Sequence, residues 1–193
     1  MATTTSRYRR DAAPVGGKHV HPELAELGAD RRTARAVGAI AAVTRISIGF
    51  VFLWAFVDKL FGLGYATPSE RAWVNGGSPT TGYLSNVEGP FGDFFGSMAG
   101  QAWADWLFMA GLLGIGVGLT AGIAMRVAAA SGALLLVFMW MASLPLENNP
   151  FMDDHLVYAM VLVLLAAVRA GDVAGLGAWW RRLPVIRDHA TLQ

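Results

Sequence analysis

Long apolar runs constrain the fold of this chain more than any other feature of its sequence. They cover residues 37–63, 105–125, 127–144 and about 150–170. An α-helix rises about 1.5 Å per residue, so roughly 20 apolar residues cross the ~30 Å hydrocarbon core of a bilayer. Charged residues make up only 15% of the chain, against about 25% in soluble domains. We therefore predict an all-α integral membrane protein, folded as a bundle of four transmembrane helices.

Polar tails flank the predicted membrane domain, which covers residues 37–170. The leader, residues 1–36, is rich in arginine and lacks the apolar region of a secretory signal. We expect it to be a retained and partly disordered tail. Residues 171–193 form the C-terminal tail, where aromatic rings beside basic groups are typical of an anchor at the membrane interface. The anchor sequence is Trp179-Trp180-Arg181-Arg182.

Lysine and arginine residues lie almost entirely on one side of the predicted spans. Twelve of them fall in the leader, at Arg126 between the second and third spans, and at or after the end of the fourth span. The connections on the other side hold only Arg71, and Lys59 lies at a helix end. Because the excess of these residues faces the cytoplasm, we predict a multi-pass protein of the cell membrane with both termini cytoplasmic.

The connection between the first and second spans, residues 64–104, combines turn-forming residues with many aromatic rings. A disordered linker lacks such apolar surface. We therefore predict a long extracytoplasmic loop that lies on the membrane interface and contains one or two short helices. Its aromatic residues include Trp73, Tyr83, Phe91, Phe94, Phe95 and Trp103.

Glycines recur every four residues in the second apolar run, at Gly114, Gly118 and Gly122. This spacing puts them on one face of a helix, where another helix can approach closely. Only Arg126 separates this run from the third, so we predict a tight turn there and an antiparallel hairpin.

A polar interruption at residues 144–158 contains the candidate catalytic residues. It is acidic and rich in amides, and it holds His155, the only histidine outside the termini. Asn149 and Pro150 also fit a helix start, since asparagine is a favoured N-cap and proline a favoured first residue. In that alternative, Asp153 would only stabilise the positive end of the helix.

The helix-start alternative does not explain Asn148, Glu147 and His155 together. His155 and Tyr158 are three residues apart, so they share a helical face. They could form a proton-transfer or hydrogen-bonding pair at the outer rim of the membrane.

Charged residues interrupt the first span near both ends. Asp58 and Lys59 end it on the outer side, where Lys59 can meet the acidic interruption. Arg45 precedes Lys59 by fourteen residues, so both side chains point roughly the same way and lie about 21 Å apart along the axis. A charge inside the membrane suggests a functional role, and extension of the side chain to the interface is the alternative.

Metal and haem sites are not expected in this chain. It has no cysteine, which excludes disulfides, iron–sulfur clusters and cysteine-bound metals. A lone histidine cannot supply the paired axial ligands of a membrane b-type haem. Adjacent residues such as Asp153, Asp154 and His155 rarely have the spacing that a metal site needs. The net charge of +1, without a basic stripe, gives no sign of nucleic-acid binding.

Five segments carry a resemblance to a known family. They are residues 45–61 (RISIGFVFLWAFVDKLF), 76–84 (GGSPTTGYL), 105–119 (DWLFMAGLLGIGVGL), 125–126 (MR) and 149–159 (NPFMDDHLVYA). In order and spacing the chain resembles the DoxX/DoxD-like family of small four-helix membrane proteins, over about residues 45–170. The DoxD-type relatives look like the membrane subunit of a thiosulfate:quinone oxidoreductase, and other members are associated with oxidative-stress complexes.

The resemblance implies a quinone-linked oxidoreductase subunit that acts on a small sulfur oxyanion at the outer face. A membrane quinone would be its cofactor. His155 with Asp154 would transfer protons, which suits a histidine near neutral pH. The substrate- or quinone-binding residues would be Lys59, Asp58, Arg45, Asn148, Asn149 and Tyr158.

Two other functions fit the same residues. The glycine-rich face and the aromatic connection equally suit a non-catalytic membrane scaffold or assembly partner of an oxidoreductase or other membrane complex. A weaker alternative is a transporter with Arg45 and Lys59 along its path. The expected partners are the lipid bilayer and either other protein subunits or further copies of the chain.

Overall fold

The computed structural model describes residues 22–189 and 192, with side chains from residue 30 onward. Part of the leader that we predict to be disordered, residues 1–21, lies outside the described residues. By its internal contacts the chain divides into residues 1–35 and residues 36–193, and the packing and the sites belong to the second unit. All regular structure in the described residues is helical, with no strand among them.

Three helices among the described residues are long and apolar enough to cross a membrane, which confirms the all-α class and agrees with a membrane protein. They are α1 (Pro22–Phe61), α4 (Ala102–Ala121) and α5 (Met125–Ala142). A fourth apolar helix, α6 (Asp154–Ala167), has 14 residues, which corresponds to about 21 Å. It is therefore shorter than the span predicted over 150–170, and the 3₁₀ turn η4 (Ala170–Asp172) follows it closely.

The turn between α4 and α5 lies before Arg126 and not at it. Gly122 takes the left-handed conformation, with φ 73°, just after α4 ends. This geometry lets the N–H of Gly122 and of the next residue, Ile123, bond to Leu119 and Gly118 carbonyls of the last turn. Arg126 consequently belongs to the first turn of α5.

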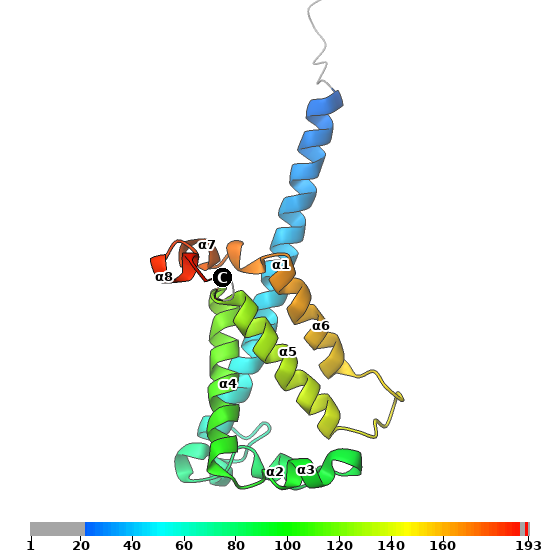
Figure 1. Ribbon diagram of the computed structural model, residues 1–193, viewed down its shortest axis with the longest axis vertical. Helices are drawn as coiled ribbons and strands as arrows, with labels where there is room; N and C mark the ends of the chain where they lie inside the picture. Colours follow the sequence, from blue (N-terminus) through cyan, green and yellow to red (C-terminus); the bar gives the residue numbers. More distant parts are fainter. Residues whose placement is uncertain (1–21, 190–191, 193) are drawn as a thin grey trace, which may run out of the picture. The chain divides into compact units, whose positions relative to one another are not determined.

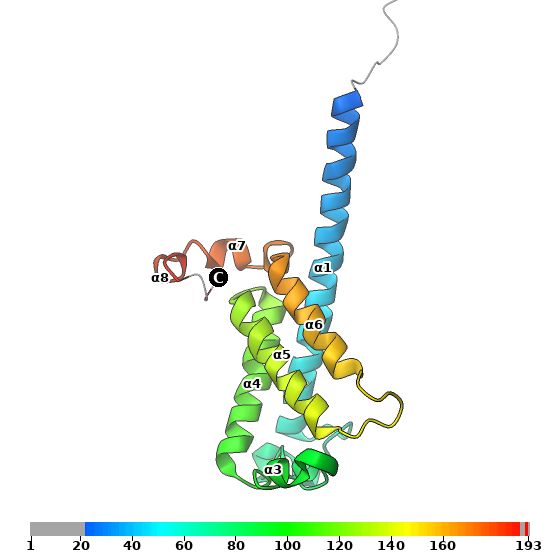
Figure 2. The same cartoon turned by 45° about the vertical axis from the view of Figure 1, so that its right-hand side comes forward.

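The apolar core forms where α1, α4, α5 and α6 meet. Buried side chains come from all four helices, including Phe52, Ile115, Leu136 and Leu162. Gly132 of α5 lies at the closest packing, because a Cβ there would be 2.7 Å from Leu162 and 3.2 Å from Ile115. Figure 1 and Figure 2 show α4, α5 and α6 side by side with the second half of α1.

The connection between α1 and α4 contains more short helices than predicted. They are η1 (Ser69–Arg71), η2 (Trp73–Asn75), α2 (Thr81–Leu84), η3 (Gly89–Phe91) and α3 (Gly92–Gly96). In both views α2 and α3 lie by the start of α4, at the same end of the helices as the connection from α5 to α6. The C-terminal helices α7 (Gly177–Trp180) and α8 (Pro184–Arg187) lie at the other end.

Glycine packing in α4 follows the predicted pattern only in part. A Cβ at Gly118 would lie 2.9 Å from Ala128 of α5, but at Gly114 it would meet no atom within 4 Å. A close approach between α1 and α4 occurs at Gly116 of α4, where a Cβ would come within 2.7 Å of Leu53. Another occurs at Gly49 of α1, where a Cβ would come within 2.6 Å of Thr120. Contact between α1 and α4 therefore depends on glycines outside the predicted set.

Candidate functional site

A large apolar cavity of about 790 Å³ lies between α4, α5 and the connection that precedes α4. Its apolar lining includes Phe108 and Gly111 of α4 and Phe138 of α5, with Tyr83 at the edge of α2. Several lining side chains of α4 and α5 are more than half exposed, for example Leu107 at 67%. The cavity therefore opens sideways, on the face that α4 and α5 share.

Lys59 is the only cationic residue among the described residues that line the cavity. Its Nζ lies 5.9 Å from the centroid of the Phe108 ring, a cation–π arrangement. Within the described part of the chain, no carboxylate lies at ion-pair distance from it. A charge in apolar surroundings is stabilised by any ligand that brings a hydrogen-bond acceptor. The cavity can thus bind a molecule with a polar head and an apolar body.

Asp58, beside Lys59, takes part in the turn after α1. Its side chain is 2% exposed, and its carboxylate accepts hydrogen bonds from the N–H groups of Tyr65 (3.3 Å) and Ala66 (3.1 Å). The turn itself needs Gly62, which has φ 65° and leaves no space for a Cβ beside Ser69. These contacts hold the end of α1 and so position Lys59. The carboxylate of Asp58, predicted to bind substrate or quinone, accepts hydrogen bonds from main-chain N–H groups.

Asp105 of α4 holds another wall of the cavity in place. Its Oδ1 accepts hydrogen bonds from the hydroxyls of Ser78 (2.8 Å) and Thr80 (2.6 Å) and from the Thr80 N–H (3.2 Å). The Ser78 hydroxyl oxygen in turn accepts the Thr81 N–H at 3.1 Å. Sequence reasoning did not identify this cluster. Its signal was an aspartate in the first turn of an apolar helix, preceded by a turn rich in serine and threonine.

Arg45 lies far along α1 from the cavity and contacts main-chain carbonyls. The residue is fully buried. Its guanidinium donates to the carbonyl oxygens of Leu119, Thr120 (2.9 Å), Val173 (3.4 Å) and Ala174 (2.9 Å). The first two belong to the last turn of α4, whose carbonyls lack the usual N–H donor four residues on; Leu119 also accepts the Gly122 N–H at 3.2 Å. Arg45 therefore contacts α4 at the opposite end of that helix from the cavity.

Space for the Arg45 guanidinium comes from two glycines. A Cβ at Gly122 would lie 3.1 Å from Nη1, and one at Gly175 would lie 3.0 Å from Nη2. No carboxylate pairs with Arg45 among the described residues, so carbonyl dipoles and the negative end of α4 stabilise its charge. The Nε–H is buried and has no acceptor in the described part of the chain.

His155 lies in the first turn of α6 and is oriented by Asp153. Asp153 is the N-cap: its Oδ1 accepts the Leu156 N–H at 3.1 Å, and its Oδ2 lies 2.7 Å from His155 Nδ1. The nearest Asp154 oxygen is 3.5 Å from the same nitrogen. Orientation through Nδ1 directs Nε2 away from the aspartate, where it can exchange a proton. Donor atoms of the three residues lie within 4.8 Å of one another, although Asp153 already serves as the helix cap.

Asn149 closes a turn and does not cap α6. Its Oδ1 accepts the N–H groups of Phe151 (2.9 Å) and Met152 (2.8 Å), the pattern of an Asx turn. The alternative in which α6 starts at Pro150 is therefore wrong, because α6 begins at Asp154. Asn148 and Tyr158 are exposed.

The structure distributes the predicted site residues over separate places. Lys59 lines the cavity, whereas no described residue from 144 to 158 does. His155 forms its polar contacts with Asp153 and Asp154, and within the described residues no hydrogen bond joins it to Tyr158. Comparisons with known protein families, with characterised proteins and with solved structures gave no match to this chain.

Proposed function

We propose that the cavity binds a membrane quinone and that the protein is the membrane subunit of a quinone-linked oxidoreductase. The observation that carries the proposal is one ammonium group, on Lys59, in an otherwise largely apolar cavity of about 790 Å³. Small-molecule sites typically enclose about 300–1,000 Å³ and combine an apolar lining with a few polar groups. A quinone supplies two-electron redox chemistry, and its carbonyl oxygens are acceptors for an ammonium donor.

The residues of the cavity suit the two parts of a quinone. Lys59 would donate a hydrogen bond to a headgroup oxygen, and the hydroxyl of Tyr83 is a second donor on the same lining. Leu107, Leu134 and Phe138 line the open side and would contact an isoprenoid tail. An opening on the shared face of α4 and α5 would admit such a ligand directly from the bilayer.

The same proposal includes a four-span topology. α6 would be the fourth span, with both termini cytoplasmic in the cell membrane. The aromatic connection before α4 and the connection from α5 to α6 would then lie outside. Support comes from the distribution of lysine and arginine along the chain, and from the position of those two connections at one end of the helices.

The resemblance to DoxD-type proteins adds an electron donor, which we propose to be a small sulfur oxyanion such as thiosulfate. His155 would exchange protons on the outer side, held by Asp153 at 2.7 Å. Since the His155 cluster is not part of the cavity lining, donor oxidation and quinone binding would occupy different places on the chain.

Replacing Lys59 by methionine is expected to weaken quinone binding roughly 10- to 100-fold, the usual effect of losing a hydrogen bond to a charged group. Methionine keeps most of the apolar stem, so the cavity keeps its shape. Binding is measured by quinone quenching of tryptophan fluorescence in lipid nanodiscs, because Trp103 lines the cavity. Lys59→Arg retains the charge and should retain most of the affinity.

The matched control is Arg182→Met, which removes an exposed cation outside the cavity lining and should leave quinone affinity unchanged. Equal affinity of Lys59→Met and the native protein would contradict the assignment of Lys59. Absence of any quinone binding, together with co-purification of a soluble redox enzyme, would instead favour the scaffold.

A further inference from the structure

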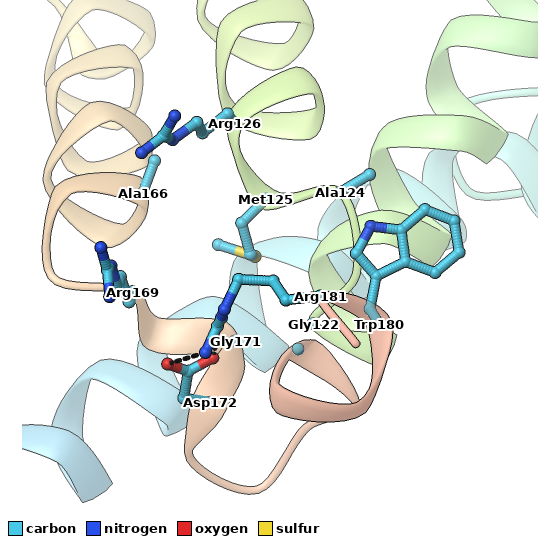
Figure 3. Close-up of a pocket in the computed structure, with 11 residues that line it drawn as sticks. Gly122, Ala124, Met125, Arg126, Ala166, Arg169, Gly171, Asp172, Trp180 and Arg181 are labelled. Carbon is cyan, nitrogen blue, oxygen red and sulfur yellow. Dashed lines mark hydrogen bonds and ion pairs between the residues drawn. The ribbon is translucent and has the colours of Figure 1, made fainter. Parts of the chain in front are cut away.

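Figure 3 shows a basic pocket. By its lining residues, this pocket lies at the other end of the helices from the cavity. Three arginines line it from different elements: Arg126 from the first turn of α5, Arg169 from the residue before η4, and Arg181 from the residue after α7. Asp172 is the only acidic residue among the described residues of the lining. The described lining therefore combines three cationic side chains with one anionic side chain.

Arg181 is held in place by Asp172. Its Nη1 and Nη2 donate to the two carboxylate oxygens of Asp172, the second at 2.8 Å, and Figure 3 shows this pair beside the pocket. The hydrogen bonds from Arg181 to Asp172, reinforced by the aspartate charge, raise the pKa of Arg181 above its ordinary value. This side chain is consequently both fixed and charged.

The N-terminal end of α5 meets the same pocket. Ala124 is the N-cap residue, and it has no side-chain group that could accept from the first turn. The first backbone bond of the helix runs from the Ala128 N–H to the Ala124 carbonyl, so the preceding N–H groups have no acceptor inside the helix. Such a helix end attracts anions through its N–H groups and its dipole, in addition to the arginines.

The pocket also lies where a membrane interface is expected. α4 ends at Ala121 and α5 begins at Met125, and the pocket lies between the ends of these two apolar helices. Trp180 belongs to the lining and its neighbour Trp179 is 56% exposed; tryptophan is enriched at headgroup depth. The enclosed space is about 20 Å³, roughly that of one water or one phosphoryl oxygen. A larger ligand would bind at the mouth.

We propose that this pocket binds the phosphate of an anionic phospholipid. Arginine is suited to phosphate because its guanidinium donates two parallel, charge-assisted hydrogen bonds. Exposed apolar side chains that could contact the acyl chains include Val127 and Val168, each next in sequence to one of these arginines. The site is separate from the quinone cavity and does not depend on quinone binding.

The test is native mass spectrometry of the purified full-length protein mixed with phosphatidylglycerol or phosphatidylcholine. The native protein should bind phosphatidylglycerol preferentially. Arg126→Gln combined with Arg169→Gln should weaken that binding roughly 30-fold, since each basic residue near an anionic lipid contributes a factor of about five. Arg182→Gln, a neighbouring arginine outside the pocket, should bind as the native protein does.

Misfolding could also explain a loss of lipid binding in the double variant. A variant that binds the lipid more tightly separates these two explanations. Asp172→Asn removes the one acidic group among the described lining residues and releases the Arg181 N–H groups that now donate to the carboxylate. Because a freed guanidinium can donate to the phosphate, phosphatidylglycerol binding should strengthen about fivefold. Native-like binding by the double variant, an equal loss in Arg182→Gln, or weaker binding by Asp172→Asn would each overturn the proposal.

Free phosphate separates a lipid site from a site for a soluble anion. Inorganic phosphate at a concentration equal to the lipid should leave phosphatidylglycerol bound, because it lacks the acyl chains that would contact the apolar surface. Displacement of the lipid by equimolar phosphate would show that the pocket recognises a soluble anion, and would overturn the lipid assignment.

Discussion

Replacing Arg45 by leucine is expected to lower the free energy of unfolding by about 3 kcal/mol, because several buried hydrogen bonds to a charged group are lost together. The substitution removes the Arg45 donor from the Thr120 carbonyl and leaves the Leu119 carbonyl with only the Gly122 N–H. It also releases Val173 and Ala174 beyond η4. We would measure unfolding in detergent by SDS titration. The free energy of unfolding of Arg45→Lys should lie between those of Arg45→Leu and the native protein, since one ammonium cannot reach both sets of carbonyls.

The same variant separates a structural role from ligand binding. Arg45 does not line the cavity, so folded Arg45→Leu protein should bind quinone with native affinity. Native stability of Arg45→Leu would show that the carbonyl contacts contribute little. Loss of quinone binding in protein that is still folded would restore the predicted role of Arg45 at a ligand site.

A methyl group added at Gly116 should destabilise the fold by about 2 kcal/mol, within the usual range for overpacking a close contact. A Cβ there would lie 2.7 Å from Leu53 Cγ and 2.9 Å from the Leu53 backbone nitrogen. A flexible side chain can move, but the backbone of α1 cannot do so locally. Gly116→Ala must therefore push α1 away from α4.

Gly114→Ala is the matched control on the same helix. Its Cβ would meet no atom within 4 Å, so the substitution should be neutral or stabilise by up to about 1 kcal/mol through better helix propensity. Both variants are compared by the same SDS unfolding. Equal effects at the two positions would contradict the packing of α1 on α4.

The membrane class was predictable because it depends on one local property, the length and polarity of apolar runs. α1, α4 and α5 follow directly from that property. The ends of elements depend on more specific chemistry. Asn149 and Asp153 are both good N-cap residues, and hydropathy does not show that Asp153 caps α6 while Asn149 closes a turn.

Closeness in sequence did not identify the partner of His155. Its Nδ1 lies 2.7 Å from Asp153 and 3.5 Å from Asp154, whereas helical spacing pointed to Tyr158, three residues on. Arg45 is different, since its acceptors lie more than 70 residues away, at Leu119 and beyond. Helical spacing gives the direction of its side chain but not which backbone groups it meets.

The cavity could not be read from the sequence, since its lining comes from α1, α4, α5 and the connection that precedes α4. Lys59 was expected to contact the acidic interruption because both lie toward the same end of their helices. The ends of the helices predict how deep Lys59 lies along the helix axis. They do not predict which neighbouring helix it faces. In the structure, Lys59 faces Phe108 of α4.

Photoaffinity labelling of the full-length protein in lipid nanodiscs with a photoreactive quinone tests the central claim most directly. Labelled peptides are identified by mass spectrometry, with and without excess unlabelled quinone. If the cavity is the quinone site, labels that the excess quinone suppresses should map to α4 between Trp103 and Ile115 and to α5 between Ser131 and Ala142. Suppressible labelling at His155–Tyr158, or labelling that excess quinone does not reduce, would contradict it.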